Sequence, residues 1–214
     1  MPILVEQHRR FLPHFQAAEQ IIALSWRLAF TLPGHMIAIK EEMGEMLNDL
    51  HRQKDSIQKH QQLQAYTKRH EEYDFFLSKC QLSDLSLCEP GIAAMLCTAF
   101  KFYDTKLYNL HAYCVMPNHI HLLIKPLPVA NGEYCKQSTI VQRLKSYTAK
   151  EINHVHNRQG KVWNDDYFDR YTRNEDDYNN VVNYILYNPV KAGLAQQIED
   201  WKYSYYYRME MLQK

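Results

Sequence analysis

Apolar and polar positions alternate most clearly between Ala112 and Pro128, which reads AYCVMPNHIHLLIKPLP. β-prone residues flank a Met-Pro-Asn break, and proline and asparagine favour turns. This pattern predicts two strands joined by a short turn. In the second strand every other side chain is apolar, and these side chains share one face because strand residues alternate between faces: Ile120, Leu122 and Ile124. We expect this face to pack against the core.

The opposite face of the same strand carries two histidines. His119 and His121 are two residues apart, so both imidazoles point to one side of the sheet. Paired imidazoles opposite an apolar face can bind a metal ion, because imidazole is a common metal ligand. An isolated His-x-His also occurs on half-exposed strands that bind no metal. The spacing alone leaves both interpretations open.

A helical pattern replaces the strand pattern between about residues 36 and 80. Apolar residues recur there at positions i, i+3, i+4 and i+7: Met43, Met46, Leu47 and Leu50. Lys, Glu, Gln and His dominate the rest of the segment, and no Pro or Gly follows Gly44 within it. We predict one long helix or a helical hairpin. The segment is too polar to be buried throughout, so we interpret it as a solvated helical insertion within a single domain of residues 1–214.

The remaining elements are predicted from shorter patterns. Residues 1–20 are polar and are expected to be irregular with a basic arm, and residues 21–32 form the first strand, which ends at a Pro-Gly pair. A helix covers residues 91–103. A further helix starts at Ser138, which can cap it, and its predicted inward positions are Ile140, Leu144, Tyr147 and Ile152.

The last predicted helix begins at Asn174, whose side chain can cap it, with Asp177 three residues later as in a capping box. Tyr184 and Asn188 lie one turn apart, so that one side chain lies above the other. Both lie off the apolar stripe, which comprises Tyr178, Val181, Val182 and Ile185. Pro189 disfavours a helical conformation at the residue before it, so we expect the helix to end there.

Composition and charge restrict the classes of function. Of the 214 residues 46% are apolar, which is enough for one domain with its own core. The formal net charge of +1 gives no general attraction to nucleic acid, so a nucleic-acid site must be a local patch. No apolar run is long enough to cross a membrane, and the N-terminus lacks the apolar core of a signal peptide. Five cysteines without a C-x-x-C pair indicate reduced thiols in a cytosolic protein.

The candidate residues together suggest chemistry on a phosphate. Such chemistry needs a positioned nucleophile and a cation that takes up developing charge. His119 and His121 offer two nitrogen ligands, and Asn188 offers an amide oxygen as a third. Tyr184, one helical turn before Asn188, would then lie beside the ion. Tyrosine, whose pKa is ordinarily about 10, is a poor nucleophile without such a metal site.

Several segments resemble the REP-associated tyrosine transposases, which belong to the HUH superfamily of single-strand DNA nucleases. The strongest is the VMPNHIH string at residues 115–121, and each of the others is weaker alone. In chain order they are LPH at 12–14, WRL at 26–28, AYCVMPNHIHLL at 112–123, KSYTA at 145–149, VW at 162–163, YFDR at 167–170, YI at 184–185 and NPVKAGL at 188–194. The resemblance covers about residues 10–35 and 85–205.

The resemblance implies an α+β fold, an antiparallel sheet of ferredoxin or RRM type with helices on one face and the tyrosine on a helix across the open face. It also implies transesterification, in which the tyrosine attacks a phosphate of single-stranded DNA and forms a 5′-phosphotyrosine. By this resemblance Tyr184 is the nucleophile, and a divalent ion, Mg²⁺ or Mn²⁺, is held by His119, His121 and Asn188. The implied substrate is single-stranded DNA that contains a hairpin, such as a REP sequence.

We expect the protein to act in the cytoplasm with the nucleoid, without a membrane partner and as a monomer rather than a homodimer. Trp163 and Phe168 could stack on bases, although core anchoring is the better interpretation of Trp163. The candidate DNA-contacting residues, each of which could equally be an ordinary surface residue, are Arg143, Lys145, Arg170, Arg173 and Lys191.

Three alternatives remain open. Tyr147 is a rival nucleophile because it lies in a shared motif on a helix, although its helical phase places it against the core. A metal-dependent hydrolase could use His-x-His without a covalent tyrosine. A non-catalytic binder of DNA hairpins could keep the fold, but it would not need Tyr184, Asn188 and the histidine pair.

Overall fold

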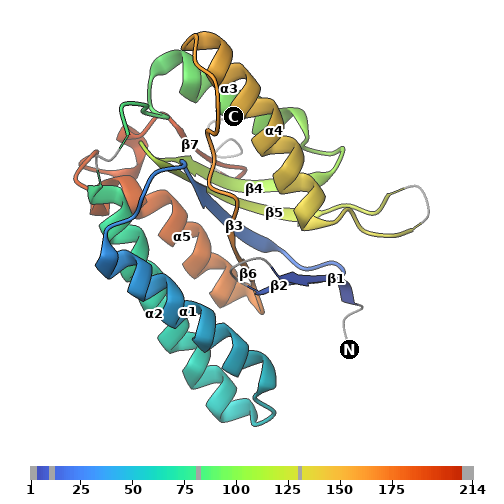
Figure 1. The fold of residues 1–214 in the computed structure, drawn as a ribbon. Coiled ribbons are helices and arrows are strands. Elements are labelled where there is room, and N and C mark those ends of the chain that lie inside the picture. The colour runs from blue at the N-terminus through green and yellow to red at the C-terminus, as the bar shows by residue number, and fades with distance from the viewer. Residues whose placement is uncertain (1–3, 10–12, 81–82, 130–131, 209–214) are drawn as a thin grey trace.

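A computed structural model describes residues 4–9, 13–80, 83–129 and 132–208. Within these residues, five strands form one antiparallel sheet in the order β6-β3-β5-β4-β7 (Figure 1). The strands are β3 (Ile22–Arg27), β4 (Tyr108–Val115), β5 (His119–Pro126), β6 (Phe168–Tyr171) and β7 (Ser204–Tyr206). β4 and β5 form the predicted hairpin, and β5 is the central strand.

Two helices cover one face of the sheet, α3 (Pro90–Phe102) and α4 (Gln137–Val155) (Figure 1). The side chains of β5 beneath them have no exposed surface: Ile120, Leu122 and Ile124. They belong to one buried cluster with Leu96 of α3 and Leu144 of α4. The predicted core face of the histidine strand is therefore confirmed.

A third helix, α5 (Glu175–Lys191), crosses the other face of the sheet (Figure 1). Its predicted stripe is buried in one cluster with Ala112 and Cys114 of β4 and Leu123 of β5: Tyr178, Val181, Val182 and Ile185. The Asn174 side chain accepts a hydrogen bond from the backbone N–H of Asp177, so the predicted cap is confirmed, whereas the Asp177 carboxylate accepts from the backbone N–H of Arg173.

α5 does not end before the proline. The helix continues through Pro189 to Lys191, although a proline inside a helix removes one backbone hydrogen bond. Asn188 and Pro189 are both buried, and Asn188 Nδ2 donates to the carbonyl oxygen of Tyr184 at 3.1 Å. Packing of this last turn outweighs the local preference on which the prediction rested.

The polar helical segment forms a hairpin, which was one of the two predicted arrangements. Its helices are α1 (Gly34–Arg52) and α2 (Ser56–Lys79), on the same side of the sheet as α5 (Figure 1). The predicted stripe faces inward, since Met43, Leu47 and Leu50 are buried with Tyr66 and Tyr73 of α2. The hairpin therefore has a small core of its own and is only partly solvated.

Two predictions near the N-terminus are wrong. Part of residues 1–20 is regular, because β1 (Leu4–Arg9) pairs with β2 (Pro13–Ala17), although some of the basic arm lies outside the described residues. The strand predicted over residues 21–32 ends at Arg27. Beyond it the chain pairs with other segments, since the Leu28 N–H donates to the Asn118 carbonyl oxygen at 2.9 Å.

The start and phase of α4 also differ from the prediction. Its cap position is Lys136 and not Ser138. Tyr147 is 46% exposed, so its predicted inward position is wrong. The buried side chains of α4 follow one another every four residues along the face toward the core, an inward line of Ile140, Leu144, Thr148 and Ile152. Thr148 Oγ1 accepts a hydrogen bond from Trp163 Nε1 at 3.0 Å, and the buried Trp163 is a core residue as interpreted.

The architecture is α+β with an antiparallel sheet, as predicted. A short 3₁₀ helix, η1 (Ile198–Asp200), leads into β7. Within the described ranges, no helix combines the length and the apolar character that crossing a membrane requires.

Candidate active site

His119 and His121 are almost completely buried, with 1% and 3% of their surfaces exposed. β5 presents them on the face opposite its apolar side chains, as the alternation predicted. Ser25 of β3 and Cys114 of β4 pair with His121 on either side. The two imidazole rings are 4.9 Å apart between their centroids. Both histidines thus lie in the interior and not on a half-exposed strand.

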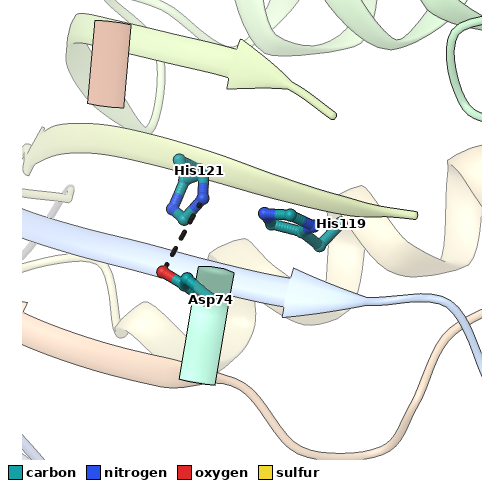
Figure 2. A group of neighbouring side chains, drawn as sticks. All are labelled: Asp74, His119 and His121. Carbon is teal, nitrogen blue, oxygen red and sulfur yellow. Dashed lines mark ion pairs between the residues drawn. The ribbon is translucent and has the colours of Figure 1, made fainter. Parts of the chain in front are cut away.

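A carboxylate from the helical hairpin completes this cluster. One oxygen of Asp74 in α2 and one nitrogen from each histidine all lie within 4.8 Å of one another (Figure 2). Asp74 is itself buried, and its Oδ2 is 3.8 Å from His121 Nε2. The Nε2 atoms of both histidines are buried and have no hydrogen-bond partner among the described residues. Unsatisfied polar atoms are costly in a protein interior, and a bound cation would satisfy both.

Asn118 ties the histidine strand to α2. Its Nδ2 donates to the carbonyl oxygens of Leu77 and Cys80, both at 2.8 Å. Its Oδ1 lies 2.7 Å from His119 Nδ1. Because this amide oxygen can only accept, His119 carries its proton on Nδ1 and presents Nε2 as the metal-binding atom. The turn between β4 and β5 therefore fixes both the tautomer of His119 and the end of α2.

Both histidines are neutral, which is the form that binds metal. Burial lowers the pKa of His119 to about 3. Burial also lowers the pKa of His121 to about 3, although the charge of Asp74 acts in the opposite direction. No proton has to be displaced from either ring at neutral pH before an ion can bind.

Tyr184 of α5 is half-buried beside this cluster. Its hydroxyl donates a hydrogen bond to Asp74 Oδ2, and its ring centroid is 5.7 Å from that of His121. Burial, followed by the charge of Asp74, raises the pKa of Tyr184 well above its ordinary value. The phenol is therefore protonated here, and the carboxylate holds its oxygen next to the two histidines.

Asn188, the predicted third ligand, is buried one helical turn after Tyr184. Its Nδ2 donates to the Tyr184 carbonyl oxygen, so the amide oxygen is the atom that would bind an ion. The candidate third metal ligand is therefore one of two oxygen donors. Asn188 was predicted from the sequence, and Asp74 was identified in the structure.

The donor set fits a divalent cation. Imidazole suits transition metals, whereas carboxylate and amide oxygens suit Mg²⁺ and Mn²⁺. Two imidazoles and one carboxylate leave coordination positions open for water or for an oxygen of the substrate. The cluster formed by His119, His121 and Asp74 can therefore bind a metal ion, although its composition selects no particular one.

A cleft of about 720 Å³ opens beside Tyr184. α2 and α5 form its walls, and β3 and β6 contribute to its floor. Three predicted DNA-contacting residues line it: Arg170, Arg173 and Lys191. Lys191 Nζ lies 5.2 Å from the ring centroid of Tyr184, whereas Arg170 and Arg173 both pair with Asp177.

The other two predicted DNA-contacting residues lie elsewhere. Arg143 and Lys145 belong to α4, which covers the opposite face of the sheet. Lys145 Nζ donates to the carbonyl oxygens of Asn164 and Asp166, both at 2.9 Å, and so holds the loop before β6. The structure does not bring these two residues together with Tyr184.

Sequence reasoning missed Asp74 of the cluster and two residues beside it, Asn118 and His70. Asp74 lies in a polar helix, where no pattern distinguishes it from the other acidic residues. Asn118 lies within the VMPNHIH string, but its position before His119 does not reveal that it binds α2. His70 lies one turn before Asp74, and its Nδ1 is 3.5 Å from Asp74 Oδ2.

Comparison with known proteins gives one family match and two curated relatives. Residues 89–188 match the family model described as IS200-like transposase. A putative REP-associated tyrosine transposase of Haemophilus influenzae is 30% identical over 106 residues, which cover 45% of this chain and 58% of that protein. The REP-associated tyrosine transposase of Escherichia coli is 28% identical over 101 residues, which cover 47% of this chain and 56% of that protein. The chain thus spans little more than half the length of these relatives.

A solved structure has a similar fold. It is described as a REP-associated tyrosine transposase bound to a REP hairpin, and it superposes with a TM-score of 0.51 at 18% identity, over 95% of this chain and 84% of that chain. The family match includes His119, His121, Tyr184 and Asn188, but its span does not include the α1–α2 hairpin. Residues 89–188 therefore match the IS200-like transposase family, and the chain resembles the REP-associated tyrosine transposases in sequence and is similar in fold to the solved structure.

Proposed function

We propose that this protein cuts and transfers single-stranded DNA through a covalent 5′-phosphotyrosine at Tyr184. The observation that carries the proposal is the hydrogen bond that places the Tyr184 hydroxyl on Asp74, within the same buried cluster as the histidine pair. The names of the curated relatives support DNA transposition. The superposed structure holds a REP hairpin, so we infer that the substrate here is also a hairpin with unpaired flanks. The protein would act as a monomer in the cytoplasm, where the nucleoid lies.

In the proposed step, the Tyr184 oxygen forms a bond to phosphorus while the bond from phosphorus to the 3′ oxygen breaks. The phenolic proton passes to Asp74, which accepts its hydrogen bond. The leaving oxygen takes a proton from solvent and becomes a free 3′-OH. Attack of a 3′-OH on the phosphotyrosine reverses these changes and joins a new strand.

His119, His121 and Asp74 would hold the divalent ion, with Asn188 as a further oxygen ligand. When bound, Mg²⁺ or Mn²⁺ takes up negative charge on the phosphate oxygens. A carboxylate has two oxygens, so Asp74 can bind an ion and still contact Tyr184. Its burial keeps Oδ2 on the Tyr184 hydroxyl and 3.8 Å from His121 Nε2.

We assign the phosphates near the cleavage point to Lys191, Arg170 and Arg173, because these three side chains line the cleft beside Tyr184. Arg143 and Lys145 could contact a hairpin stem only where the DNA reaches the opposite face of the sheet. We therefore give them the smaller part in binding.

Tyr184→Phe tests the nucleophile. After incubation with Mn²⁺ and labelled hairpin DNA with unpaired flanks, a denaturing gel should show no covalent adduct, because the attacking oxygen is missing. DNA affinity should change little, since it depends on phosphate contacts and stacking. The free energy of unfolding should fall by about 1–3 kcal/mol, because the buried Asp74 loses a hydrogen-bond donor. This cost exceeds that of an ordinary surface substitution.

Tyr147→Phe is the matched control, since it makes the same chemical change at an exposed tyrosine on α4. It should form the adduct like the wild type, and a fully duplex form of the DNA should not be cut. An adduct with Tyr184→Phe and none with Tyr147→Phe would assign the reaction to Tyr147. Binding by the wild type without any adduct would favour a hairpin-binding protein. Cleavage without an adduct by both the wild type and Tyr184→Phe would favour a hydrolase.

Asp74→Asn and Asn188→Ala separate the two candidate oxygen ligands. Asn188→Ala should raise the Mn²⁺ concentration needed for adduct formation, roughly 10- to 100-fold on the scale known for perturbed metal sites. Asp74→Asn also removes the proposed proton acceptor, so its adduct should be lost at any Mn²⁺ concentration and its metal affinity has to be measured directly. Calorimetric titration of Mn²⁺ into each variant, made in the Tyr184→Phe protein, measures this affinity without catalysis. Unchanged Mn²⁺ affinity in Asp74→Asn would show that Asp74 only holds Tyr184.

A further inference from the structure

Phosphates are assigned to three cations of the cleft between α2 and α5, but its α2 wall has no assigned ligand. We propose that α2 forms one wall of a binding site for the unpaired nucleotides beside the scissile phosphate, and that its side chains read the bases. This inference rests on the proposed function, because it places the scissile phosphate at Tyr184. It gives the helical hairpin a role in substrate choice.

The position of the cleft supports this assignment. Tyr184 and His121 are both among its lining residues, so its inner end is the proposed reaction site. Its volume of about 720 Å³ lies within the range of roughly 300–1,000 Å³ typical of small-ligand sites. The small side chains of Ala23 and Ser25 line the part of the cleft formed by β3 and leave room above the sheet. A DNA strand that runs from the scissile phosphate into this cleft passes between α2 and α5.

The cleft offers aromatic surface to bases. Tyr187 of α5 lines it and is 47% exposed, on the side of the helix away from the core stripe. Phe168 of β6 is half-buried in the cleft, with its ring centroid 4.8 Å from that of His70. Stacking on such rings binds any base, because every base has a π-face.

Amide side chains in the cleft could distinguish one base from another. Gln64 projects from α2, and Asn180 and Asn183 project from α5, so amides line both walls. An amide both donates and accepts hydrogen bonds, and it can pair with two atoms on the edge of one base. Unpaired bases also expose their Watson–Crick edges to such amides, whereas a duplex hides those edges in its base pairs.

The charges in the cleft balance, so phosphate contacts alone give it little attraction for DNA. Arg170 and Arg173 are both paired with Asp177, and the other charged residues of the lining offset one another, with Lys68 and Lys191 against Glu71, Asp169 and Asp176. Few counterions would therefore be released when DNA enters, so binding in the cleft should depend only weakly on salt. Stacking and hydrogen bonds to bases must then supply much of the affinity.

Base selection tests the role of α2. The probe is a pool of oligonucleotides with one fixed hairpin and short randomised unpaired flanks, bound to protein that carries Tyr184→Phe so that nothing is cut. Sequencing of the bound fraction should show a base preference next to the cleavage point. Gln64→Ala should relax this preference at one or two positions. Gln61→Ala, on an exposed part of α2 outside the cleft, should retain it.

Blocking the cleft gives a second readout. Thr67 is half-buried in the α2 wall, and Thr67→Trp should lower the affinity for unpaired oligonucleotides roughly five- to 150-fold. Ala65→Trp, at an exposed α2 position outside the cleft, should leave this affinity unchanged. A hairpin without unpaired flanks should bind to both variants equally. Tyr187→Ala, at an exposed position, should also weaken the binding of unpaired DNA and serves if Thr67→Trp fails to fold.

The two proposals fail in different ways. If the wild type forms the covalent adduct but Gln64→Ala, Thr67→Trp and Tyr187→Ala match their controls, the cleft does not hold these nucleotides and only this inference is overturned. If no adduct forms but the base preference depends on Gln64, the cleft binds DNA and the proposed chemistry is overturned instead.

Discussion

The two faces of β5 are equally buried but differ in what their burial achieves. On one face Leu122 and its apolar neighbours pack beneath α3 and α4, and every contact adds to stability. On the other face His119 and His121 lie beneath α2 and α5 with their Nε2 atoms unsatisfied. Burial of the first face raises the free energy of unfolding, whereas burial of the unsatisfied nitrogens on the second face lowers it.

This difference shows which parts of the fold serve the site. A buried polar atom without a partner persists where the surrounding structure holds it there. Here Asn118 holds His119 and the end of α2, and Lys79 Nζ donates to the Ala192 carbonyl oxygen at 3.0 Å, which links α2 to the end of α5. The hairpin and α5 thus enclose the polar face in the way that α3 and α4 enclose the apolar one.

The largest expected effect comes from removing the polar side chains. The double variant His119→Ala with His121→Ala should lower adduct formation at least roughly 100-fold, because both nitrogen ligands are lost. The protein should remain folded, since each ring takes with it a buried nitrogen that has no partner. Denaturing gels and thermal unfolding measure the two effects. Loss of cooperative folding would instead make these histidines structural residues.

Leu122→Ala makes the opposite change on the apolar face of the same strand. Leu122 has no exposed surface, and its truncation should lower the free energy of unfolding by about 2–5 kcal/mol through lost burial and a new cavity. Denaturant titration measures this loss. Adduct formation per folded molecule should stay near the wild-type value, because Leu122 points away from the site. A loss of activity larger than the loss of folded protein would show that the two faces are coupled.

The alternation in β5 could be predicted because it is local. A strand places successive side chains on opposite faces, so the string HIHLLI alone separates His121 from Leu122. The relation between Tyr184 and Asn188 is equally local, since residues four apart on a helix are neighbours. These local patterns therefore predicted the β4–β5 hairpin, its core face and two parts of the candidate site, whereas the antiparallel sheet was implied by the family resemblance.

Contacts between distant segments could not be predicted in this way. Tyr184 and Asp74 are 110 residues apart in the chain, and their hydrogen bond exists only because the hairpin docks beside α5. Local preferences also failed where packing decides the outcome. Pro189 stays helical in a buried turn, and Tyr147 is displaced from the inward line of α4 by Thr148, whose hydroxyl bonds to Trp163. The interpretation of residues 36–80 as a solvated insertion did not identify the buried side of α2 for the same reason, since Tyr66, Tyr73 and Asp74 are buried by contacts with distant segments.

The smallest expected effect concerns a third histidine on the polar side of the sheet. His111 of β4 lies beside the first half of α5, with its Nδ1 3.1 Å from the hydroxyl of Tyr178. Burial, followed by the charge of Lys125, lowers the pKa of His111 to about 4, while Asp104 raises it and Arg208 lowers it further. The pKa in the unfolded chain is about 6.5.

Between these two pKa values the unfolded chain binds a proton at this position that the folded protein does not. The contribution of His111 to stability is therefore present above pH 6.5 and is lost as the pH falls to about 4. Its partial exposure reduces the effect to an order of 1 kcal/mol. Denaturant titrations at several pH values should show a shallower pH dependence for His111→Gln than for the wild type, and His154→Gln, at an exposed position on α4, is the control. If the free energy of unfolding depends equally on pH in His111→Gln and in the wild type, His111 gains its proton without unfolding. The packing beside Tyr178 would then open easily enough to admit solvent.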